Sequence, residues 1–218
     1  MRNSAFSFYR SLKHYLQDKK PYIVSYVPSK NGQIFEIWTN KLGRMVAKSP
    51  MILEEEIIEK FEFGLPLIPG KILRQVYSFF LELSEIDEVE VMLQLFYDTE
   101  REEYILDCPN QSVSKISVNY RTNSRFQGRN SIRYIEVAQM HSHNTMNAYF
   151  SQTDDQDEQS FKIYGVFGGL GKKKPECLFR VKANTTSMNI SISQIFDDTS
   201  IGYEEYPKEW LSNVYINK

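Results

Sequence analysis

Residues 140–154 have the sequence MHSHNTMNAYFSQTD and contain two of the three histidines of the chain. The preceding residues, 132–140, have the composition of a β-strand. Because side chains of a strand alternate between its two faces, His141 and His143 are expected on the same side where this strand ends. Asp154 follows a ten-residue loop, in the first turn of a predicted helix, and can return a carboxylate to the same point. Two imidazoles and one carboxylate leave one tetrahedral position open, which is typical of catalytic rather than structural zinc.

Two further side chains complete a hydrolytic site in this prediction. Glu90 opens a strand-like run, residues 90–97, and is the candidate general base. A carboxylate in that role takes a proton from water and later returns it to the leaving amine. Ser151 is the candidate hydrogen-bond donor to the oxyanion of the tetrahedral intermediate.

The complete pattern resembles a known motif. A Glu, followed downstream by His141-x-His143, seven residues, Ser151, two residues and Asp154, resembles the JAMM motif of JAB/MPN-domain zinc metalloproteases. The resemblance covers roughly residues 66–195 and is to members carried by bacterial plasmids, phages and integrative elements. It implies an α/β (α+β layered) fold of the JAB/MPN deaminase-like type, with a curved mixed sheet flanked by helices.

The resemblance also implies an activity: hydrolysis of an isopeptide or peptide bond at the C-terminal tail of ubiquitin or a ubiquitin-like protein, as a deubiquitinase does. His141, His143 and Asp154 would hold one Zn²⁺ per chain, with Glu90 as the base and Ser151 as the oxyanion partner. The catalytic Glu of the family opens the first core strand after the first helix, which favours Glu90 over Glu88, the alternative of the same strand parity. A ubiquitin-like protein or its conjugate would be the substrate, and ubiquitin-activating or ubiquitin-conjugating proteins are candidate partners.

Glycine and proline residues mark a domain boundary in the sequence. Gly64, Pro66, Pro69 and Gly70 predict a boundary between an N-terminal β-rich extension, 1–66, and a metalloprotease-like domain, 67–218. Apolar residues at helical spacing predict a helix over 71–85, and a short helix is predicted over 54–63. Strands are predicted at the following ranges: 22–26, 34–38, 90–97, 104–107, 113–120, 132–140, 163–167, 177–182 and 188–192.

Composition limits the other function classes. The 218 residues carry a net charge of −2, which disfavours general nucleic-acid binding. No apolar run is long enough to span a membrane, so we expect a cytoplasmic protein. Cys108 and Cys177 are far apart in the sequence and are expected to be free thiols without a functional role.

Simpler explanations remain for the same residues. Ser151 and Asp154 also form a capping-box pattern that begins a helix, and an isolated His-x-His pair is more often a surface feature than a metal site. Two other functions stay open: a catalytically silent MPN-type scaffold that binds partners, and a zinc amidohydrolase that acts on a sulfur-carrier protein or a small-molecule amide.

Overall fold

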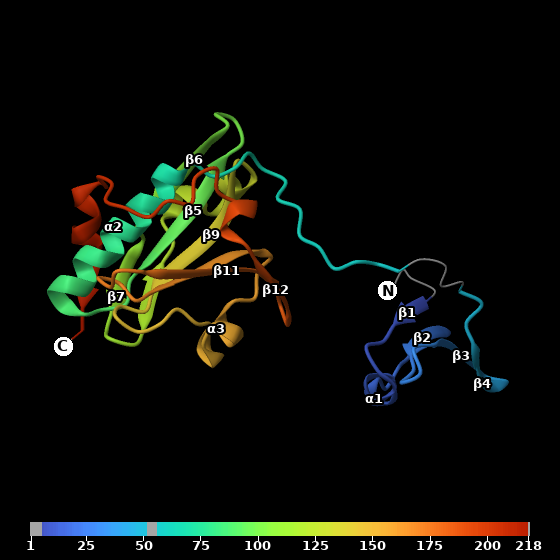
Figure 1. Cartoon of the computed structure of the whole chain (residues 1–218). Coiled ribbons are helices and arrows are strands. Elements are labelled where there is room, and N and C mark those ends of the chain that lie inside the picture. Colours follow the sequence, from blue (N-terminus) through green and yellow to red (C-terminus); the bar gives the residue numbers. More distant parts are fainter. Residues whose placement is uncertain (1–5, 52–55, 218) are drawn as a thin grey trace. The chain divides into compact units, whose positions relative to one another are not determined.

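The chain folds into two compact units. The computed structural model describes residues 6–51 and 56–217, and its units are Met1–Glu59 and Lys60–Lys218. The division precedes the boundary predicted after residue 66, because Phe61, Phe63 and Leu65 already pack against the core of the second unit. Figure 1 shows the elements of each unit.

The first unit is a four-stranded sheet with one short helix. Strand order is β1-β2-β3-β4, and only β1 and β2 run parallel. Tyr9, Tyr15, Val27 and Ile37 form its small core. The elements are β1 (Phe6–Phe8), α1 (Leu12–Gln17), β2 (Val24–Pro28), β3 (Ile34–Asn40) and β4 (Gly43–Lys48).

A six-stranded mixed sheet forms the centre of the second unit. Strand order is β12-β11-β10-β9-β5-β6, in which β9 and β10 run parallel and the other neighbours antiparallel. The strands are β5 (Met92–Asp98), β6 (Glu103–Asp107), β9 (Tyr134–Ser142), β10 (Lys162–Gly168), β11 (Glu176–Ala183) and β12 (Thr186–Ile190). The second unit also contains a three-stranded sheet of order β13-β7-β8. Its strands are β7 (Asn110–Val113), β8 (Val118–Arg121) and β13 (Val214–Ile216).

Helix α2 (Gly70–Asp87) covers one face of the six-stranded sheet (Figure 1). It begins after Pro69, and the Gly70 N–H donates to the Asp197 carboxylate at 2.7 Å. It ends at Glu88, which adopts a left-handed conformation (φ 51°). The apolar positions that predicted this helix are all buried against the sheet: Ile72, Leu73, Val76, Phe79, Phe80 and Leu83.

The other helices are short. Those described in the second unit are α3 (Gln152–Asp157) and four 3₁₀ turns: η1 (Ser124–Phe126), η2 (Gly128–Ile132), η3 (Ile192–Gln194) and η4 (Lys208–Asn213). No helix in the described ranges is long and apolar enough to cross a membrane.

Two of the predicted elements are wrong. Residues 56–63 form no helix, and residues 54 and 55 lie outside the described residues. A helix of about ten residues is marginal on its own, and Phe61 and Phe63 pack against the core of the second unit without forming one. The strand predicted over 113–120 is two antiparallel strands, β7 and β8, joined where the Ser114 N–H donates to the Ser117 carbonyl. The mixed α/β class is confirmed, and both cysteines are free, as predicted.

Candidate metal centre

His141 lies at the end of β9, on the sheet face opposite α2, and His143 follows directly after the strand. Met140 is buried in the core beneath α2, so His141 points to the other face. Ser142, between the histidines, joins β9 to the start of β5: its N–H donates to the Val91 carbonyl at 2.9 Å, and its Oγ accepts from the Val91 N–H at 3.0 Å. This fixes the strand end, and the Nε2 atoms of His141 and His143 lie 3.2 Å apart.

Asp154 reaches the histidines from α3. Its Oδ1 is 3.5 Å from Nε2 of His141. Its Oδ2 accepts from the Ser151 N–H at 2.6 Å, while the Asp154 N–H donates to Ser151 Oγ at 3.2 Å. Ser151 and Asp154 therefore form the capping box that begins α3, and this cap orients one carboxylate oxygen toward the imidazoles.

The spacing of these donor atoms fits a tetrahedral zinc ion. Bonds of about 2.0–2.1 Å to nitrogen and oxygen place neighbouring ligand atoms of a tetrahedron about 3.3 Å apart. The two distances from His141 Nε2, 3.2 Å to His143 and 3.5 Å to Asp154, lie on either side of this value. One ligand atom from each residue lies within 4.8 Å of the others, so His143 and Asp154 would have to approach each other further to complete a tetrahedral site.

The electrostatics keep both imidazoles neutral. Burial lowers the pKa of His141 to about 4, against the opposing effect of the Asp154 charge. Burial also lowers the pKa of His143. Neutral imidazole is the form that binds a metal. Both histidines can therefore act as metal ligands at neutral pH.

Glu90 and Glu88 have different environments. Glu90 is 8% exposed and lines the same cavity as the histidines. Burial, with a smaller contribution from the charge of Asp154, raises its pKa to about 7. Glu88 lies at the surface, where its carboxylate pairs with Lys115 at 2.7 Å. Of these two residues, only Glu90 is therefore placed to exchange a proton inside the cavity.

The site opens into a cavity of about 420 Å³. Its wall includes Ser151 and Tyr149, whose ring lies edge-on to His143 with the centroids 4.7 Å apart. Four of its apolar and aromatic lining residues are also exposed to solvent: Ile116, Tyr120, Met146 and Tyr149. The cavity that contains the histidines is therefore open to solvent at these side chains.

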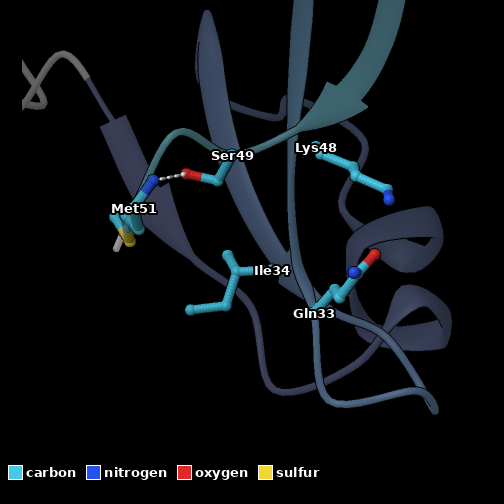
Figure 2. A pocket seen from close by; sticks show the side chains of 5 residues that line it. All are labelled: Gln33, Ile34, Lys48, Ser49 and Met51. Atoms are coloured by element: carbon cyan, nitrogen blue, oxygen red, sulfur yellow. Dashed lines mark hydrogen bonds between the residues drawn. The ribbon is translucent and has the colours of Figure 1, made fainter. Parts of the chain in front are cut away.

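A smaller cavity of about 240 Å³ lies in the first unit (Figure 2). It is lined by Gln33, Ile34, Lys48, Ser49 and Met51. The residues predicted for catalysis and metal binding all belong to the second unit, so this cavity is separate from the candidate centre.

Two buried cations on β11 were not assigned a role from the sequence. Arg180 and Lys182 are 5% and 4% exposed. Their alternation with Phe179 and Val181, which lie in the core beneath α2, places them on the same sheet face as the histidines. Charged residues are rarely fully buried unless they are paired. Charged residues within a strand of alternating apolar residues could therefore have indicated these two positions from the sequence.

No family model matches the chain, and no curated protein matches it.

Proposed function

We propose that this protein is a JAMM-type zinc isopeptidase with a JAB/MPN fold, which hydrolyses an amide bond at the C-terminal tail of a ubiquitin-like protein. The observation that carries the proposal is the meeting of His141, His143 and Asp154, with the two donor distances from His141 close to those of tetrahedral zinc. Glu90 lines the same cavity, so a proton acceptor accompanies the three ligands.

The order of elements supports the proposed fold. Glu90 lies between the first helix of the second unit and β5, where the resemblance expects the catalytic Glu. The His-x-His pair lies at the end of β9, and Asp154 lies in the first turn of the next helix. Each residue therefore occupies the type of element that the motif requires.

Each residue has a defined task in this reaction. Zinc, when bound, polarises the carbonyl of the scissile bond and lowers the pKa of water to about 7. Glu90 accepts the proton of the attacking water and passes it to the nitrogen of the leaving amine. Its raised pKa, about 7, suits a group that must both take and return a proton near neutral pH.

Ser151 can serve both the helix cap and the oxyanion. Its Oγ accepts the hydrogen bond from the Asp154 N–H, which uses an oxygen lone pair and leaves the hydroxyl proton free to donate. Because Ser151 lines the cavity, that proton can be directed at the developing oxyanion.

Substitution of Ser151 separates these two tasks. We expect Ser151→Ala and Ser151→Gly to lower kcat by about 10²–10³-fold, as loss of an oxyanion donor does, with zinc content unchanged. Glycine costs a helix cap only a few tenths of a kcal/mol, so a role restricted to capping predicts a nearly normal Gly variant. The assay is steady-state cleavage of a ubiquitin-like fusion, with Ser151→Thr as the variant that keeps both hydroxyl functions.

The proposed function is tested with a panel of substrates and a chelator. The zinc-loaded protein should cleave a reporter fused behind a ubiquitin-like tail, and a chelator should abolish the cleavage. Cleavage only of small amides or of sulfur-carrier fusions would replace the proposed substrate class. Zinc binding without cleavage of any of these substrates would contradict the proposed hydrolase and favour the scaffold.

A further inference from the structure

Helix α3, which carries Asp154, is a short helix. It has six residues, and none of them is buried. An isolated helix of this length is unstable in water, since most helical stability in proteins comes from packing of an apolar face. The position of the Asp154 carboxylate therefore depends on contacts made by the rest of the unit.

Arg180 supplies such contacts on both sides of the Ser151–Asp154 turn. Its Nε and Nη2 lie 2.7 and 2.5 Å from Oε2 of Glu158, and its Nη1 lies 2.6 Å from Oδ1 of Asp155. On the other side of the turn, the guanidinium carbon lies 3.9 Å from the centre of the Phe150 ring. One buried side chain thus holds the residues immediately before and after the site segment.

Lys182 holds the C-terminal end of the same helix. Its ammonium donates to the carbonyls of Asp155 at 2.9 Å and Asn184 at 2.7 Å, and also to the carbonyl of Glu158. A cation at a helix C-terminus interacts favourably with the helix dipole and satisfies free carbonyls. Both cations project from β11, so they tie α3 to the central sheet.

We propose that Arg180, assisted by Lys182, is a positioning residue for the metal centre: it holds α3 so that the Asp154 carboxylate meets the two imidazoles. This rests on the proposed zinc site and adds a determinant of its affinity. Lysine cannot make the contacts that Arg180 makes with Glu158, Asp155 and Phe150. A lysine has one point charge and cannot reach Glu158 and Asp155 together or stack on Phe150 in the same way.

The zinc dissociation constant measures this role directly. We expect Arg180→Met to raise the zinc Kd by about 10–100-fold, the range found when partners of metal ligands are removed, with Arg180→Lys between this variant and wild type. Glu158→Gln keeps the shape of its side chain but loses the ion pair, and should raise the Kd less than Arg180→Met does. The Kd is measured on the purified full chain by competition with a chromophoric chelator.

Arg133→Met is the matched control. Arg133 forms a comparable ion pair with buried Asp98, with the closest atoms 2.5 Å apart, at the opposite end of β5 from Glu90. This variant should lower thermal stability and leave the zinc Kd within about twofold of wild type. Near-ultraviolet circular dichroism establishes that each variant is folded, and Glu158→Gln and Arg180→Lys carry the test if Arg180→Met does not fold.

The outcomes separate this inference from the proposed function. Wild-type protein that binds no zinc contradicts the proposed function itself. Wild-type protein that binds zinc, together with folded Arg180 and Glu158 variants of unchanged Kd, overturns only the positioning role. An equal loss of affinity in Arg133→Met would show that general destabilisation is the cause, and would also overturn it.

Discussion

Glu90→Gln is expected to lower kcat by about 10²–10⁴-fold, the contribution of a general acid–base group, and to leave the zinc content near that of wild type. Glutamine keeps the size of the side chain but cannot accept the proton of the attacking water. Glu90 is buried in the cavity of the candidate metal centre, and burial raises its pKa to about 7. We therefore expect the effect in turnover and not in metal binding.

Glu88→Gln is the matched control for this substitution. The Glu88 carboxylate is exposed and pairs with Lys115 at the surface, where an ion pair contributes at most about 1 kcal/mol. The kcat of Glu88→Gln should stay within about twofold of wild type. Full activity in Glu90→Gln, or its loss in Glu88→Gln instead, would show that the base is assigned to the wrong residue.

Gly168→Ala is expected to destabilise the second unit by about 3 kcal/mol, the upper end of the usual range for overpacking. A Cβ on Gly168 would lie 2.3 Å from the Ala148 nitrogen, and 2.5 Å from the carbonyl carbon of Asn147 and the carbonyl oxygen of Met146. All three are backbone atoms, so they cannot move aside as a flexible side chain can. The loop between His143 and Ser151 would have to shift.

The thermal midpoint measures this cost. For a unit of this size, about 3 kcal/mol corresponds to a decrease of about 6–12 °C, and we expect weaker zinc binding because the displaced loop connects two elements of the site. Gly64→Ala is the control, since its Cβ would meet nothing within 4 Å. An unchanged midpoint in Gly168→Ala would contradict the close backbone approach at this position.

Local patterns in the sequence were sufficient for the elements that carry their own signal. Apolar spacing located α2, predicted over 71–85 and observed as Gly70–Asp87. Strand parity predicted that His141 and His143 leave β9 on the same side, and their Nε2 atoms lie 3.2 Å apart. These features depend only on neighbours in the chain, which a sequence displays directly.

Features that depend on distant partners were not predicted. Strands β7 and β8 were expected as one strand, but a turn divides them and β13, from the C-terminal end of the chain, completes their sheet. The contacts of Arg180 with Glu158 and Asp155 likewise join β11 to α3 across the sheet face. Periodicity carries no information about such pairs, because their spacing is set by the tertiary fold.

Zinc content, measured by elemental analysis of the wild-type protein and a His141→Ala/His143→Ala double variant, decides whether these histidines and Asp154 form a zinc site. We expect about one zinc per chain in the wild type and none in the variant, since alanine removes two of the three proposed protein ligands. No zinc in the wild type after supply at neutral pH, or equal zinc in both proteins, would contradict the proposed zinc site.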